Sequence, residues 1–86
     1  MRILVAEDEQ DLNSLIKRRL KEADYSVDAC FDGEEALDFL RGAEYDALVL
    51  DIMMPKRDGL SVLRWLRQSH NPLPVLLLTA RDSIED

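Results

Sequence analysis

The stretch YDALVLDIMMPKRDG, residues 45–59, predicts a buried strand that ends on an acid. Four apolar residues, 47–50, precede Asp51, and Pro55 and Gly59 follow it in a loop. A strand that is apolar on both faces is typical of the middle of a parallel sheet. We therefore expect a strand from Asp46 to Asp51 whose last residue places a carboxylate at the edge where the sheet ends.

The rest of the chain alternates between strand and helix patterns. Further strands are predicted at residues 2–6, 26–30 and 75–79, the last again apolar on both faces. Helices are predicted from about residue 11, over residues 34–41 with Gly42 as C-cap, and after Asp58 as N-cap. Residues 80–86 have the pattern of another helix start. This order predicts an α/β fold, an open parallel sheet of the flavodoxin-like kind with strand order 2-1-3-4.

Apolar spacing predicts which helix residues face the core. Those residues are Leu12, Leu15, Ile16 and Leu20 on the first helix, Ala36, Leu37, Phe39 and Leu40 on the second, and Leu60, Val62, Leu63 and Leu66 on the third.

Composition limits the class of protein. The 86 residues suffice for one domain, and 47% hydrophobic with 34% charged residues is typical of a folded chain. Acids outnumber bases 18 to 11, a net charge of -7 that disfavours direct binding to nucleic acid or an anionic membrane. A single cysteine excludes an internal disulfide, and no apolar run is long enough for a signal peptide or membrane span. We expect a cytoplasmic chain.

Acids follow two strands that are neighbours in the predicted sheet. Glu7 and Asp8 follow the first strand, and Asp51 ends the third, so their carboxylates should lie within a few ångströms of one another. Three such groups repel one another and raise their pKa values unless a cation intervenes. Oxygen ligands of this number, completed by water, favour Mg²⁺. Neither GxGxxG nor a Walker lysine motif is present.

Three motifs occur in order at strand ends: ILVAEDE at 3–9, LVLDIMMPKRDG at 48–59 and LLLTA at 76–80. Together they resemble the receiver domain of bacterial two-component response regulators, particularly those with a winged-helix DNA-binding effector domain. The resemblance covers all 86 residues. It implies that residues 1–86 are the N-terminal part of a single receiver domain without its effector domain. The fifth strand, the lysine that ends it and the last two helices would be missing.

The resemblance also implies roles for individual residues. Asp51 would accept a phosphoryl group from a sensor histidine kinase and thereby switch a transcriptional effector domain. Mg²⁺ would be bound by Asp8, Asp51 and the backbone carbonyl of Met53, with Glu7 acting mainly through water. Thr79 would supply the switch hydroxyl. Such a domain is regulatory and at most catalyses its own phosphorylation and dephosphorylation, so we do not expect an enzyme.

Alternatives remain open on the sequence. A pseudo-receiver that only binds other proteins is compatible with the missing lysine. A haloacid dehalogenase type phosphatase needs a second acid two residues after the nucleophile, where this chain has Met53. A flavodoxin-like cofactor binder needs a phosphate loop where residues 7–9 are three acids. Without a fifth strand, residues 75–79 would form an exposed edge, so we expect either a homodimer through that edge or marginal stability.

Overall fold

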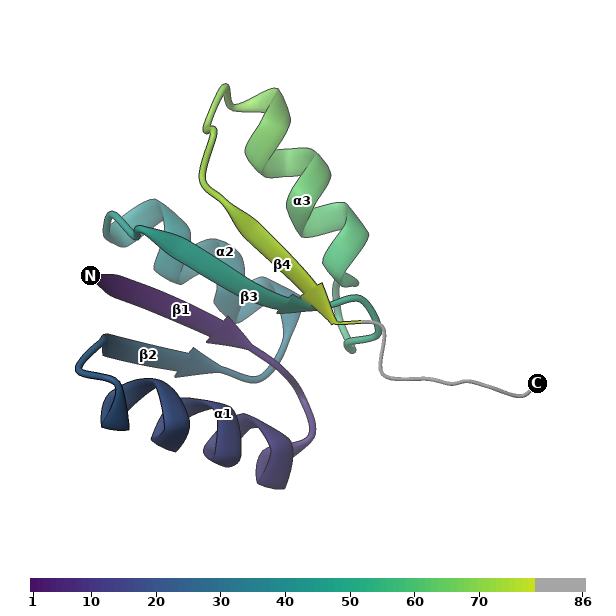
Figure 1. Cartoon of the computed structure of the whole chain (residues 1–86). Coiled ribbons are helices and arrows are strands. Elements are labelled where there is room, and N and C mark those ends of the chain that lie inside the picture. The colour runs from purple at the N-terminus through teal and green to yellow at the C-terminus, as the bar shows by residue number, and fades with distance from the viewer. Residues whose placement is uncertain (79–86) are drawn as a thin grey trace.

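One parallel sheet carries the helices on both of its faces (Figure 1). The computed structural model describes residues 1–78. In chain order its elements are β1 (Arg2–Ala6), α1 (Gln10–Glu22), β2 (Ser26–Cys30), α2 (Gly33–Gly42), β3 (Ala47–Asp51), α3 (Gly59–Gln68) and β4 (Val75–Leu78). The strands lie in the order β2-β1-β3-β4, and every pair is parallel. The predicted flavodoxin-like fold and strand order are confirmed.

Most element boundaries agree with the prediction, with three corrections. α1 begins one residue early, at Gln10, because the carboxylate of Glu9 caps it by accepting the Leu12 N–H at 2.6 Å. Gly42 is the last residue of α2 rather than its C-cap, which is Ala43. β3 begins at Ala47, since the side chain of Asp46 accepts the backbone N–H of Arg2 at 2.7 Å.

The alternation of side chains along β1 divides the core in two. Leu4 and Ala6 join a cluster packed by α2 and α3, whereas Ile3 and Val5 join a cluster packed by α1. β1 is consequently buried on both faces, as a central parallel strand requires. Within residues 1–78, no helix has the length and apolarity needed to cross a bilayer.

Several residues predicted to face the core are exposed. Leu15, Phe39 and Leu60 have 38 to 45% of their surface accessible, and Leu76 in β4 has 63%. The prediction that β4 is buried on both faces is therefore wrong for this part of the chain. Leu76 pairs in register with Val49 on the face that α1 covers, but α1 packs on β1 and β2 and does not extend over β4.

Gly59 allows the chain to fold back beside the acceptor strand. A Cβ at this position would lie 2.1 Å from the carbonyl oxygen of Asp51, so only glycine fits. The Gly59 N–H also donates to the Ile52 carbonyl at 2.8 Å. Its φ is not positive, so the glycine is required by close approach of the backbone rather than by conformation. The loop after β3 is thereby closed against the strand it leaves.

Replacing Gly59→Ala should destabilise the fold by about 1–3 kcal/mol, because the new methyl group meets backbone atoms that cannot rotate away. Gly42→Ala is the matched control, since nothing lies within 4 Å of its added Cβ. We expect this control to be neutral or slightly stabilising, as Gly42 is still within α2, its φ is not positive, and alanine has the higher helix propensity. Urea unfolding of both variants measures the difference, and equal midpoints would contradict the role given to Gly59.

Candidate functional site

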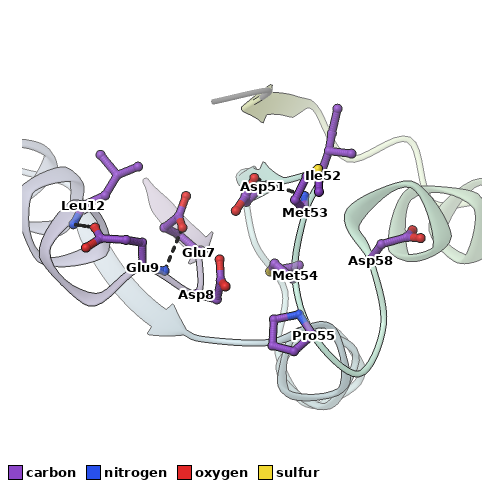
Figure 2. A pocket seen from close by; sticks show the side chains of 10 residues that line it. All are labelled: Glu7, Asp8, Glu9, Leu12, Asp51, Ile52, Met53, Met54, Pro55 and Asp58. Carbon is purple, nitrogen blue, oxygen red and sulfur yellow. Dashed lines mark hydrogen bonds between the residues drawn. The ribbon is translucent and has the colours of Figure 1, made fainter. Parts of the chain in front are cut away.

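Three carboxylates meet at the carboxyl edge of the sheet (Figure 2). One oxygen each from Glu7, Asp8 and Asp51 lies within 4.8 Å of the other two. Glu7 and Asp8 follow β1, and Asp51 is the last residue of its neighbour β3. Glu7 and Asp51 are buried, whereas Asp8 is exposed. The convergence expected from the strand order is confirmed.

Backbone hydrogen bonds orient the two buried acids. The Glu7 Oε2 atom accepts the N–H of Glu9 at 2.8 Å, and Asp51 Oδ1 accepts the N–H of Met53 at 3.2 Å. Glu7 Oε1 is buried and has no hydrogen-bond partner among the residues that the structure describes. The third acid of the run, Glu9, turns instead to α1 and caps it (Figure 2). Three residues therefore form the acidic cluster.

Burial shapes the ionisation of the cluster. The pKa of Glu7 is raised to about 7, mainly by burial; the N–H of Glu9 opposes this rise and the charge of Asp51 adds to it. Burial also raises the pKa of Asp51, against the N–H of Met53, which favours the charged form. Both acids consequently hold their negative charge at a cost in free energy that a nearby cation would offset.

The donor set fits a metal ion. All three ligands are carboxylate oxygens, which hard divalent cations prefer, and the orphaned Glu7 Oε1 is a buried acceptor with a lone pair to spare. The acids line an open pocket together with Met53, whose side chain is 57% exposed. The cluster can therefore hold a divalent cation in a pocket that opens to solvent.

The loop that follows Asp51 is held by the first turn of α2. Lys56 Nζ lies 3.7 Å from Asp32 Oδ2, and Arg57 Nε lies 3.3 Å from Glu34 Oε2. A Cβ on Gly33 would lie 1.9 Å from the Arg57 carbonyl oxygen, so the two backbones touch. Arg57 thus ties this loop to α2 through its side chain and through its backbone.

The roles expected for Thr79 and for the Met53 carbonyl remain predictions. Thr79, predicted as the switch hydroxyl, lies outside the residues that the structure describes. The Met53 carbonyl remains a predicted ligand. The backbone N–H of Met53 donates to Asp51, which places this residue beside the cluster. Sequence reasoning overlooked Asn13, which is buried next to Glu7. The signal was available, because Asn13 is the polar member of a helical stripe that continues with Ile16 and Leu20.

A parallel sheet with an acidic cluster at the carboxyl ends of its central strands is the arrangement expected of a receiver domain in a signalling protein. The model for the response regulator receiver domain matches residues 3–86. This chain belongs to that family, and it is a regulatory domain of two-component signalling. Receiver domains of response regulators interact with sensor histidine kinases.

Individual relatives agree with this assignment. The response regulator MprA of Mycobacterium avium (strain 104) is 49% identical over 86 residues, which are 100% of this chain and 38% of that protein. The Francisella response regulator 1452 receiver domain matches with a TM-score of 0.90 and 39% identity, covering 95% of this chain and 68% of that one. Thermotoga maritima TrrA in complex with Mg²⁺–BeF matches with a TM-score of 0.88 and 40% identity, covering 94% and 70%.

The stability of the metal-free protein should depend on pH through Glu7. Its pKa of about 7 in the folded state exceeds the 4.5 of an unperturbed glutamate, so the folded state binds more protons between these pH values. The free energy of unfolding should therefore fall as pH rises from about 4.5 to about 7 and change less above that. We would measure the free energy of unfolding with urea at several pH values in this range. It should change less with pH in Glu7→Gln than in the native protein. An unchanged slope in the variant would contradict the assignment to Glu7.

Proposed function

We propose that this chain accepts a phosphoryl group on Asp51 from the phosphohistidine of a sensor kinase, in a reaction that needs Mg²⁺. The observation that carries the proposal is the meeting of Glu7, Asp8 and Asp51 within 4.8 Å at one edge of the sheet. The resemblance of the fold to TrrA, a receiver solved with Mg²⁺ and beryllofluoride, supports it.

Asp51 is the nucleophile of this proposal. One of its carboxylate oxygens attacks the phosphorus, the P–N bond to the kinase histidine breaks, and the histidine nitrogen takes up a proton. The backbone N–H of Met53 donates to Asp51 Oδ1 and so orients the carboxylate. Figure 2 shows the Asp51 carboxylate turned toward Glu7 and Asp8. The attacking group is thus held in place before the donor arrives.

The acids around Asp51 would hold the metal. Asp8, Asp51 and the Met53 carbonyl would be direct ligands, with Glu7 acting mainly through water. When bound, Mg²⁺ neutralises the negative charge that gathers on the transferred phosphoryl group. Glu7 contributes a buried acceptor with no protein partner among residues 1–78, which suits a metal-bound water.

The response to phosphorylation is also a proposal. Thr79 would supply the switch hydroxyl that binds a phosphoryl oxygen. Residues 1–86 would form the N-terminal part of one receiver domain, because they span 38% of the M. avium relative and about two thirds of the solved receiver chains. The output would be control of a transcriptional effector domain. The chain acts as a regulator and catalyses at most its own phosphorylation and dephosphorylation.

Beryllofluoride, an acyl phosphate mimic, should bind this chain when Mg²⁺ is present and not when Mg²⁺ is omitted. A bound fluorine NMR signal should appear for the native sequence and vanish in Asp51→Asn, which lacks the nucleophilic oxygen. Asp46→Asn is the matched control at the opposite end of β3, where its side chain accepts the Arg2 N–H and asparagine can do the same. This control should bind normally.

One outcome of that experiment would overturn the proposal. If this chain shows no bound signal while a complete receiver responds in parallel, phosphotransfer is excluded and the chain acts only as a protein-interaction module. Binding that survives in Asp51→Asn would place the acceptor elsewhere.

A second copy of this chain is proposed as the partner of β4. Within residues 1–78, β4 pairs with β3 on one side only, so its outer backbone groups are free to extend the sheet. Leu76 adds an apolar side chain, 63% exposed, next to that edge. Backbone pairing combined with apolar burial favours association of two copies.

The 86-residue chain should therefore sediment at micromolar concentration with twice the mass of one 9.9 kDa chain. Leu76→Lys should shift it to a monomer, because a charge beside an edge strand opposes pairing. Leu60→Lys is the control, since Leu60 is similarly exposed but lies on α3, across the sheet from Leu76. A well-folded monomer of the native sequence at that concentration would rule out this dimer.

A further inference from the structure

The most buried residue of α1 is an amide. Asn13 is 1% exposed and is the one buried residue of this helix, whose apolar residues Leu12, Ile16 and Leu20 are only partly covered. A polar side chain is stable in such a place only when its hydrogen bonds are made, since burial without partners is costly. The contacts of Asn13 therefore indicate what the residue does.

Both hydrogens of the Asn13 amide are used. Nδ2 donates to the carbonyl oxygen of Glu7 at 2.9 Å and to that of Cys30 at 2.9 Å. Because carbonyl oxygens only accept, the NH₂ side of the amide must face them. The Cys30 carbonyl also accepts the N–H of Glu7 at 3.1 Å. One side chain thus joins α1 to the carboxyl ends of both β1 and β2.

The carbonyl that Asn13 holds belongs to the peptide between Glu7 and Asp8. A peptide is planar, so fixing its oxygen fixes the plane and the direction in which the chain enters Asp8. Glu7, Asp8 and Asp51 repel one another, and this repulsion acts to move the loop after β1 away from β3. The two hydrogen bonds of Asn13 fix the Glu7 carbonyl relative to α1 and the end of β2, and so limit how far the loop can move or rotate.

We infer that Asn13 is a positioning residue that holds the Glu7–Asp8 peptide so that both carboxylates face Asp51. This inference rests on the proposed metal-dependent function and adds a residue to its machinery. Removing a group that hydrogen-bonds to a metal-ligand residue, without binding the metal itself, typically lowers metal affinity 10- to 100-fold. Asn13 meets that description because it contacts the backbone of the ligand-bearing loop and none of the three carboxylates.

The test compares two destabilised variants of the 86-residue chain. Asn13→Leu keeps the number and branching of the side-chain heavy atoms and removes both donors. Val27→Ala is the control, because it removes apolar atoms from the core beneath α1 and has no contact with the acids. Urea unfolding gives the stability of each, Mg²⁺ titration by calorimetry gives the affinity, and NMR hydrogen exchange of the metal-free protein follows the amides of residues 7–9.

We expect Asn13→Leu to bind Mg²⁺ about 10- to 100-fold more weakly and to exchange the amides of Glu7 and Glu9 faster than the native protein. Val27→Ala should keep native affinity and local exchange. Asn13→Ser retains one donor, so its Mg²⁺ affinity and amide exchange should lie between those of the native protein and of Asn13→Leu. It replaces Asn13→Leu if that variant does not fold. Equal loss of affinity in Val27→Ala, or native affinity in both Asn13 variants, would reduce Asn13 to a purely structural residue.

Failure of the proposed function gives a different result. In that case the native chain binds no Mg²⁺, and the exchange of residues 7–9 in the metal-free protein still decides the role of Asn13. Native exchange at these amides in both Asn13 variants would then overturn the inference.

Discussion

Repulsion between carboxylates that the sheet forces together is the constraint on which the rest of the site depends. β1 and β3 are parallel neighbours, so the acids at their carboxyl ends must meet. Burial of Glu7 and Asp51 makes their charge costlier still and raises both pKa values. Only a rigid scaffold keeps such groups in place, and the nearly complete burial of β1 and β3 on both faces provides it.

The chain offsets part of this repulsion with its own backbone. The N–H groups of Glu9 and Met53 each bind one oxygen of a buried acid, which favours the charged form. No N–H reaches Glu7 Oε1 among the residues that the structure describes. The backbone therefore leaves the negative charge on this oxygen uncompensated. A cation bound by the three acids would offset this remaining negative charge.

The sequence was sufficient to predict the fold and the acidic cluster because both follow from strand order. Asp51 ends a strand that is apolar throughout, and Glu7 and Asp8 follow its neighbour, so their meeting requires no knowledge of side-chain packing. Periodicity failed where exposure depends on how far a neighbouring element extends, as for Leu15 and Leu76. It also could not reveal contacts between distant residues, such as the ion pair of Arg57 with Glu34.

The contact between Gly59 and the Asp51 carbonyl joins the start of α3 to the acceptor residue itself. α3 is 10 residues long, about 15 Å at 1.5 Å per residue, and its first residue is also hydrogen-bonded to Ile52. A helix is stiff over that length, so a movement of the acceptor strand at Gly59 would tilt α3 as a rigid body. A small tilt of α3 about Gly59 would become a larger displacement at Ser69 and His70. A shift of the Asp51 backbone would thereby be transmitted to the far end of α3.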